Sequence, residues 1–308
     1  MSSTRRAYIA WLTVCIVWGT TYLGIRIALE TIPPMLMAGM RWIAAGTLLS
    51  TALAIGGATL PKPRAWPALA LLGILLLGFG NGAVVWAELT VPSGLTAVLV
   101  ATSPFWMVGI DAFVGRPRRS SQESDRAKAG DPLTLRRVLG LIIGFLGIVM
   151  LVWPELHVEG AGGFVTGLVS TQIACIGWAL GSTYARHRGR THAQDENVLA
   201  TAAFEMIFGG IALFLVGLAI GEWPRLAFST RSSLALGHLI IFGACAAFTA
   251  YAYALKHLPV ATVSLYAYVN PLIAVVLGML VLQEPFTVRM AMAAAVVLGG
   301  MALVRDTG

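Results

Sequence analysis

The chain has 308 residues, of which 57% are hydrophobic and only 11% charged, and its formal net charge is +7. Soluble domains carry about 25% charged residues, so a chain with a mean hydropathy of +0.80 cannot cover its surface for water. The composition excludes a soluble globule and predicts an all-α polytopic membrane protein that is embedded in the lipid bilayer.

The basic net charge does not indicate a nucleic-acid partner, because Lys and Arg fall in short loops between apolar runs and form no continuous basic face. The three cysteines, Cys15, Cys175 and Cys245, lie inside apolar runs without a paired spacing. We interpret them as small buried hydrophobic residues and expect neither a disulfide nor a metal site. No cofactor motif is recognisable.

Ten apolar runs are each long enough to cross a bilayer, which takes about 20 residues per helix. The N-terminal run has the basic start of a signal peptide but is too long and lacks a small-residue cleavage site, so it is taken as the first span. In chain order, the predicted spans cover residues 7–29, 34–56, 66–87, 93–113, 136–153, 163–185, 197–219, 233–255, 260–282 and 287–304.

The loops predict the orientation of these spans. Segment 115–135 is rich in serine and mixed charge, and we expect it to be a mobile cytoplasmic loop. If the N-terminus is cytoplasmic, most Lys and Arg residues also lie on the cytoplasmic side. The opposite side then holds only Arg26, Arg225, Arg231 and Arg289. Basic loops remain inside, so both termini are predicted to be cytoplasmic.

The chain also contains a repeat. "CIVWGTTYLGIR" (15–26) and "CIGWALGSTYAR" (175–186) carry Cys, Ile, Trp and Arg at the same relative positions, and "PSGLTAVLVATSP" (92–104) parallels "PVATVSLYAYVNP" (259–271). Five helices per copy is an odd number, so the second copy enters the membrane from the other side. The prediction is two inverted five-helix repeats, 1–156 and 157–308, an arrangement typical of transporters.

Several segments together resemble the drug/metabolite transporter superfamily, and within it the ten-helix bacterial exporters of the EamA type. They are "WGTTYLGIRIAL", "RWIAAGTLL", "TAVLVATSPFW", "GWALGSTYARH", "ATVSLYAYVNPLIAVVLGMLVLQEP" and "AAAVVLGGMALV". The resemblance implies export of amino acids, related metabolites or drugs through a central cavity at the repeat interface, with the aromatic amino-acid exporters as the nearest type. The long charged loop departs from the short loop usual in this group.

Trp18 and Trp178 lie near the middle of the first and sixth spans, although tryptophan prefers the membrane interface. They either pack between helices or form the wall of one shared cavity with an apolar face and an N–H donor. Asn81, in the glycine-rich third span, either binds substrate or caps a neighbouring helix. Trp86 and Glu88 are placed near the outer mouth.

Spans four and nine each carry a proline after a polar stretch, Pro104 and Pro271, which we interpret as a packing kink or as a hinge beside the cavity. The polar residues around them and on facing spans complete the predicted substrate-binding cavity. It consists of Trp18, Tyr22, Asn81, Thr102, Ser103, Trp178, Tyr251, Tyr266 and Asn270.

Two ionisable residues within spans are candidates for a charge role. Glu205 could relay protons or pair with Arg41, and Arg41 could attract a substrate carboxylate or serve in a structural ion pair. The region of the first repeat that corresponds to Glu205 contains Arg41 in place of an acidic residue. This favours a static ion pair between Glu205 and Arg41, and hence uncoupled downhill transport.

The sequence therefore predicts a bacterial inner-membrane exporter of amino acids and related small metabolites that works by alternating access. The alternatives are a proton-coupled multidrug or nucleotide-sugar transporter, or a multispan membrane enzyme. No Walker loop, HExxH, GxSxG or paired CxxC is present, so we predict no catalytic residues and no enzyme activity. The sequence leaves the oligomeric state open, a monomer included.

Overall fold

The computed structural model describes residues 3–114, 135–152, 161–192, 197–258, 260–263 and 265–304. Within these ranges the chain is helical and has no β-strand. Six helical stretches are long and apolar enough to cross a membrane, and shorter apolar helices accompany them. The predicted mobile loop, 115–135, lies outside the described residues except for Leu135.

The first two predicted spans correspond to α1 (Ser3–Ala28) and α2 (Pro34–Ile55). The third predicted span is one continuous helical stretch. It consists of η1 (Pro63–Ala65), α3 (Trp66–Gly73), the π-helix η2 (Ile74–Gly82) and α4 (Ala83–Ala87). The fourth is divided into α5 (Ser93–Val100) and α6 (Ser103–Val114), and α8 (Leu135–Val152) follows.

The second half begins with α9 (Ala161–His192) and α10 (Val198–Ala219). After η4 (Trp223–Arg225), a second continuous helical stretch consists of α11 (Thr230–His238), the π-helix η5 (Leu239–Ala246) and α12 (Ala247–His257). The predicted ninth span is divided into α13 (Val260–Val263) and α14 (Tyr266–Leu282), and α15 (Val288–Val304) ends the fold.

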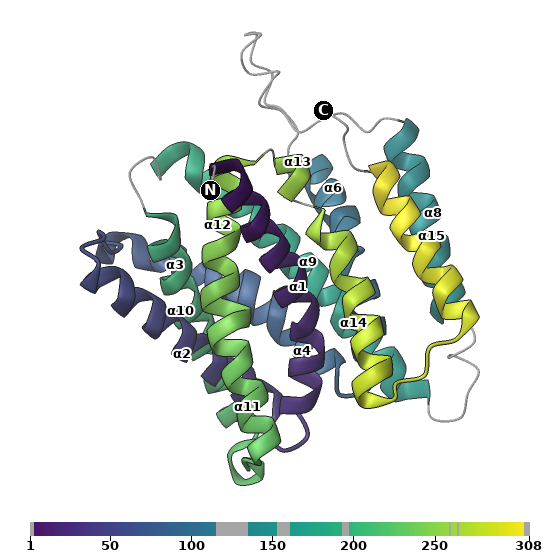
Figure 1. The fold of residues 1–308 in the computed structure, drawn as a ribbon, viewed down its shortest axis with the longest axis horizontal. Helices are drawn as coiled ribbons and strands as arrows, with labels where there is room; N and C mark the ends of the chain where they lie inside the picture. Colours follow the sequence, from purple (N-terminus) through teal and green to yellow (C-terminus); the bar gives the residue numbers. More distant parts are fainter. Residues whose placement is uncertain are drawn as a thin grey trace.

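Helices from the two halves of the chain pack against each other (Figure 1). The helix α2 lies against α10, α8 lies beside α15, α1 contacts α12 and α14, and α9 contacts η2 and α6. Glycine residues allow this closeness. A Cβ atom added at Gly46 would collide with the backbone of Ala203, and one added at Gly300 would collide with the backbone of Gly144. Glycine at such contacts lets helix backbones approach in a membrane.

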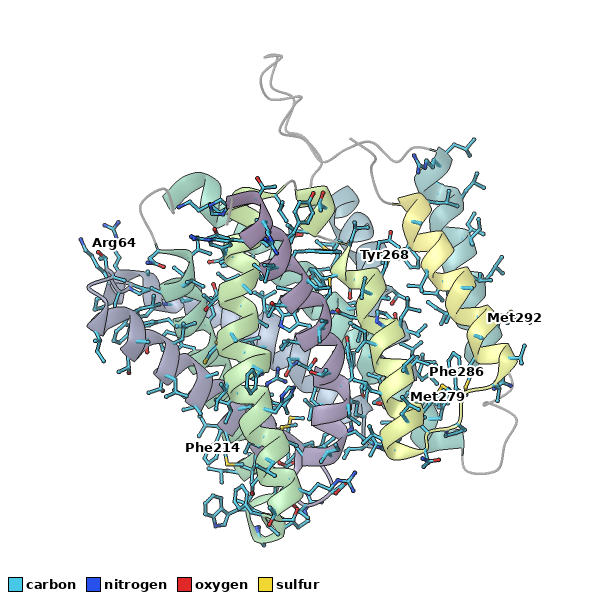
Figure 2. The ribbon with its side chains drawn as sticks, in the orientation of Figure 1. Arg64, Phe214, Tyr268, Met279, Phe286 and Met292 are labelled. Atoms are coloured by element: carbon cyan, nitrogen blue, oxygen red, sulfur yellow. The ribbon has the colours of Figure 1, made fainter. Side chains whose placement is uncertain are left out.

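The outer surface of the bundle is apolar. Large hydrophobic side chains project from it, and Figure 2 labels Met292 on α15 and Met279 on α14, which are 54% and 41% exposed. A surface of this kind is unfavourable in water and matches lipid tails. The start of α1 and the end of α15 lie at the same end of the bundle (Figure 1).

Two carboxylates, the buried Glu222 and the partly buried Glu284, cap helix N-termini on distant segments. Glu222 accepts hydrogen bonds from the backbone N–H groups of Met35 and Leu36 (3.3 and 2.9 Å) at the start of α2. Glu284 accepts from the N–H groups of Ser93 and Gly94 (2.9 and 3.3 Å) at the start of α5. Each bond satisfies a donor that the helix itself leaves unpaired, and the negative charge also favours the helix N-terminus.

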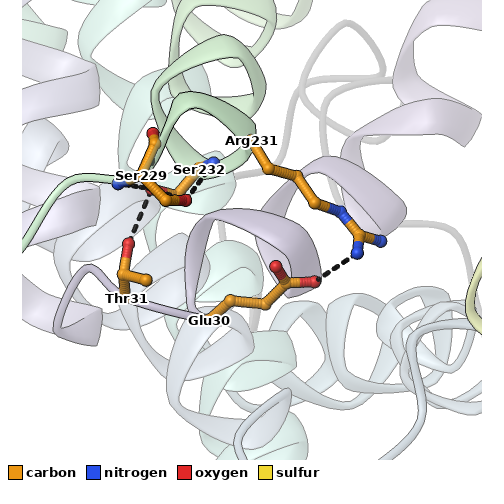
Figure 3. A network of polar contacts seen from close by, with 5 residues as sticks. All are labelled: Glu30, Thr31, Ser229, Arg231 and Ser232. Atoms are coloured by element: carbon orange, nitrogen blue, oxygen red, sulfur yellow. Dashed lines mark hydrogen bonds and ion pairs between the residues drawn. The ribbon is translucent and has the colours of Figure 1, made fainter.

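A smaller polar network joins the end of α1 to the start of α11 (Figure 3). Ser229 and Ser232 form a capping box, and the Ser232 hydroxyl lies 2.6 Å from that of Thr31. The guanidinium of Arg231 lies 3.4 Å from the carboxylate of Glu30, and both side chains are exposed. The hydroxyl contacts orient α11, while the exposed ion pair contributes little.

Candidate functional site

A cluster of aromatic rings lies inside the bundle between α1, α12 and α14. The Trp18 ring is 5.4 Å from Phe248, 5.2 Å from Tyr251 and 4.9 Å from Tyr266, measured between ring centroids. Tyr251 and Tyr266 also meet edge to face at 5.8 Å. These four residues are called the aromatic cluster below. Rings at these distances form favourable pairs, and the two tyrosines add hydroxyl groups to an otherwise apolar interior.

The π-helix η5 supplies a polar partner for this cluster. The indole N–H of Trp18 donates a hydrogen bond of 3.1 Å to the carbonyl of Gly243 within η5. A π-helix is rare and is frequently found at functional sites. The bond therefore fixes the Trp18 ring at a place where the backbone of the facing helix departs from ordinary α-helical geometry.

Trp178 has the corresponding place in the other half. It lies on α9 beside the other π-helix, η2. The two helices are so close that a Cβ atom added at Gly80 would lie 3.3 Å from the Trp178 ring, and one added at Gly177 would collide with Phe79. Each tryptophan thus packs against a π-helix. Within the described ranges, the ring contacts of Trp18 do not include Trp178, so the structure does not bring the two indoles together.

Asn81 makes a structural contact between helices. Its side-chain oxygen accepts a hydrogen bond of 2.9 Å from the indole N–H of Trp42 on α2. The Trp42 ring in turn meets Phe248 edge to face at 6.1 Å. Asn81 is only partly buried, and one good bond leaves its NH₂ group available as a donor.

Tyr22 and Arg41 lie near the aromatic cluster. Tyr22 follows Trp18 by four residues on α1, so the two side chains lie on the same face of the helix. The Arg41 guanidinium stacks on the Trp42 ring at 4.4 Å. Glu88 directly follows α4, which contacts α2. Glu205, which was expected to be a possible partner of Arg41, is half-buried on α10.

Thr102 and Ser103 lie where the fourth span is interrupted. Their hydroxyls donate to the carbonyls of Leu99 and Val100, each at 2.6 Å, and so satisfy acceptors at the end of α5. The Cys175 thiol lies 3.3 Å from the Ser103 hydroxyl. Pro104 occupies the first turn of α6, where a missing backbone N–H costs nothing.

Asn270 and Pro271 are both buried within α14. With its amide oriented toward the available acceptors, Asn270 donates to the carbonyls of Cys15 and Tyr266, each at 3.0 Å. One bond crosses to α1 and the other stays within α14. Asn270 thereby connects α14 to α1, about one turn from Tyr266 of the aromatic cluster.

A pocket of about 580 Å³ lies apart from these residues, between the start of α5, α9 and the segment before α15. It is lined by Thr90, Pro92, Leu95, Gly163, Phe164, Pro285, Thr287, Arg289 and Met290. None of the predicted site residues lines it. The described residues contain no group of three or more His, Cys, Asp or Glu side chains that could hold a metal ion.

The sequence analysis did not select Trp42, Phe248 or Glu88 as site residues. Glu88 was placed near the outer mouth with Trp86, yet its side chain is fully buried while Trp86 is 36% exposed. A carboxylate directly after the apolar run "GAVVWA" was the available signal, because an acid beside a membrane helix is costly unless it is compensated.

The fold and this interior together define a polytopic helical membrane protein with aromatic and charged groups gathered between its two halves. The chain belongs to the EamA-like transporter family, whose model matches residues 5–121 and 165–305. The resemblance seen in the sequence is thereby confirmed.

Relatives support this assignment. The chain is 36% identical over 268 residues to the uncharacterized inner membrane transporter YedA of Escherichia coli strain K12, covering 85% of this chain and 78% of that protein. It is 24% identical over 292 residues to protein PecM of Dickeya dadantii, covering 94% and 89%. One crystal structure matches with a TM-score of 0.64 and 20% identity, covering 97% and 96% of the two chains, and supports the fold alone.

Proposed function

We propose that the chain is a bacterial inner-membrane exporter of amino acids and related small metabolites. The observation that carries this proposal is the aromatic cluster, in which Trp18 of one half meets Phe248, Tyr251 and Tyr266 of the other. Rings with polar edges suit substrates that are partly apolar and partly polar.

We further propose ten membrane-spanning helices arranged as two inverted five-helix repeats, 1–156 and 157–308. The helix contacts support this arrangement, because α1 packs on the eighth and ninth spans (α12 and α14) as α9 packs on the third and fourth (η2 and α6). Spans two and seven contact each other, as do spans five and ten. The paired π-helices are also consistent with it.

Such an arrangement suits alternating access, in which one repeat moves against the other around a fixed central cavity. In our proposal, both termini face the cytoplasm, and the cavity is formed by Trp18, Tyr22, Asn81, Thr102, Ser103, Trp178, Tyr251, Tyr266 and Asn270. Pro104 and Pro271 lie at the hinges. Substrate leaves down its own gradient without a coupled ion.

The test is counterflow in proteoliposomes that contain the purified full chain. Vesicles are loaded with an unlabelled amino acid and diluted into a trace of the same labelled compound, and we expect transient accumulation of label. Protein-free vesicles give the background. If a nucleotide sugar or a cationic drug exchanges and no amino acid does, the proposed substrate class is wrong.

A further inference from the structure

Glu88 differs from Glu222, the other carboxylate that is buried among the described residues. Its side chain is 0% exposed, and neither carboxylate oxygen receives a hydrogen bond from any described residue. Glu222, equally buried, accepts two backbone N–H groups. A buried carboxylate without hydrogen bonds is strongly unfavourable. Helix capping therefore explains Glu222 but does not explain Glu88.

Arg41 shows the complementary feature on α2. It is 3% exposed, and its Nε and Nη1 atoms bond to nothing in the described ranges. Its stacking on Trp42 fixes the guanidinium plane but uses no N–H donor. A guanidinium offers five donors in a fixed geometry that fits a carboxylate. Arg41 thus presents an unused carboxylate-binding edge inside the bundle.

The two residues are near each other without forming a pair. Glu88 directly follows α4, which contacts α2, and Val85 of α4 shares one buried cluster with Ala38 and Trp42 of α2. No ion pair joins Arg41 to Glu88 in the described structure. Arg26 donates to the backbone carbonyl of Glu88 and leaves the carboxylate oxygens unbonded. Buried polar atoms of both residues are therefore left without a hydrogen-bond partner in one region of the bundle.

This charged region adjoins the aromatic cluster. Gly243 contacts both regions. A Cβ atom added at Gly243 would lie 3.5 Å from Nη2 of Arg41, and the Gly243 carbonyl accepts the hydrogen bond from the Trp18 indole N–H. On the other side, Trp18, Tyr22 and Arg26 recur every four residues on one face of α1, and Arg26 donates to the backbone carbonyl of Glu88. A ligand with a charged head at Arg41 and Glu88 would therefore place its remaining atoms against the aromatic cluster.

We propose that Arg41 and Glu88 form the recognition site for the head group of a zwitterionic α-amino acid. The Arg41 guanidinium binds the carboxylate, the Glu88 carboxylate binds the ammonium group, and the side chain of the amino acid packs in the aromatic cluster. Each ligand charge supplies the hydrogen bonds that its protein partner lacks. This inference rests on the proposed function, since it specifies the substrate class of the same interior site.

The test compares three ligands that share one phenyl ring. L-Phenylalanine carries both charges, phenethylamine lacks the carboxylate, and 3-phenylpropionate lacks the ammonium group. Binding to the purified full chain in detergent is measured by ligand-induced thermal stabilisation. We expect the wild type to bind phenylalanine at least about tenfold more tightly than either analogue, the effect expected from one lost charged hydrogen bond.

Variants assign each charge to a residue. Arg41→Gln should weaken phenylalanine and 3-phenylpropionate and leave phenethylamine within about twofold, whereas Glu88→Gln should weaken phenylalanine and phenethylamine and leave 3-phenylpropionate within about twofold. Glu222→Gln is the matched control, since it makes the same change at an equally buried carboxylate that only caps a helix. It should preserve the order of the three ligands.

Three results would overturn the site. They are equal binding of the three ligands by the wild type, an equal loss of all three in both variants, and no effect of either variant. The first result needs no variant, so misfolding of a variant cannot protect the proposal. Transport is assayed separately by counterflow. Amino-acid counterflow without discrimination between the ligands rejects this site alone, whereas absence of amino-acid counterflow rejects the proposed function.

Discussion

The indole N–H of Trp42 donates a 2.9 Å hydrogen bond to the side-chain oxygen of Asn81, and this bond joins α2 to the π-helix η2. A double-mutant cycle with Trp42→Phe and Asn81→Ala should give a coupling free energy of about 1 kcal/mol, typical of one buried hydrogen bond. Unfolding in mixed micelles measures it. Strictly additive losses would show that the bond does not stabilise the fold.

Trp18→Ala and Trp178→Ala should each reduce counterflow at least about tenfold while expression remains near normal. Trp18 loses its bond to Gly243 and three ring contacts, and tenfold corresponds to only about 1.4 kcal/mol. Trp66→Ala is the control, because this ring is 41% exposed and lies outside the aromatic cluster. If both variants transport normally, neither tryptophan forms the cavity wall. Failure to express would favour a purely structural role.

The two carboxylate caps should be important for stability. Glu222→Ala and Glu284→Ala each leave backbone N–H groups without an acceptor at the start of α2 or α5, and each should lower the free energy of unfolding by about 1–3 kcal/mol. Glu30→Ala, which removes an exposed ion pair, should change it by less than about 1 kcal/mol. Equal effects in all three variants would contradict the capping role.

Impermeant thiol reagents test the proposed orientation in intact cells. In a background without native cysteines, Trp223→Cys should be labelled because it follows the seventh span on the outer side, where this side chain is 57% exposed. Arg64→Cys, at an exposed position of the short helix η1 before α3, should be labelled only after the cells are opened. The reverse pattern would place both termini outside.

Driving force can be tested with an imposed pH gradient. We expect that the gradient does not concentrate substrate in proteoliposomes, and that Glu205→Gln keeps its downhill flux. Glu205 is half-buried and lies on α10. Uncoupled transport does not require this carboxylate to bind and release a proton. Accumulation against the gradient that disappears in Glu205→Gln would make Glu205 the coupling residue.

Hydropathy predicted the helix positions well, because apolar length alone decides where a chain can cross lipid. The predicted spans 34–56 and 197–219 correspond to α2 (Pro34–Ile55) and α10 (Val198–Ala219). The interruption at Ala101 and Thr102 and the π-helix η5 were not predicted, since both change the hydrogen-bond register and leave the hydropathy unchanged.

The candidate site was predicted less completely. Repeat symmetry drew attention to Trp18, and the structure places the rings of Tyr251 and Tyr266 beside it. Glu88 could not be recognised as an interior residue, because its burial depends on which other spans surround the end of the third one. A single sequence contains no information on that packing beyond the apolar face of each helix.

The carboxylate caps also limit how the bundle can open. Glu222 follows α10 and holds the start of α2, while Glu284 follows α14 and holds the start of α5. Separating either pair at that end would leave backbone N–H groups at a helix start without their carboxylate acceptor. In the proposed alternating-access motion, α2 and α10 would therefore move together at that end, as would α5 and α14. A passage on that side would then open between these two capped pairs of helices.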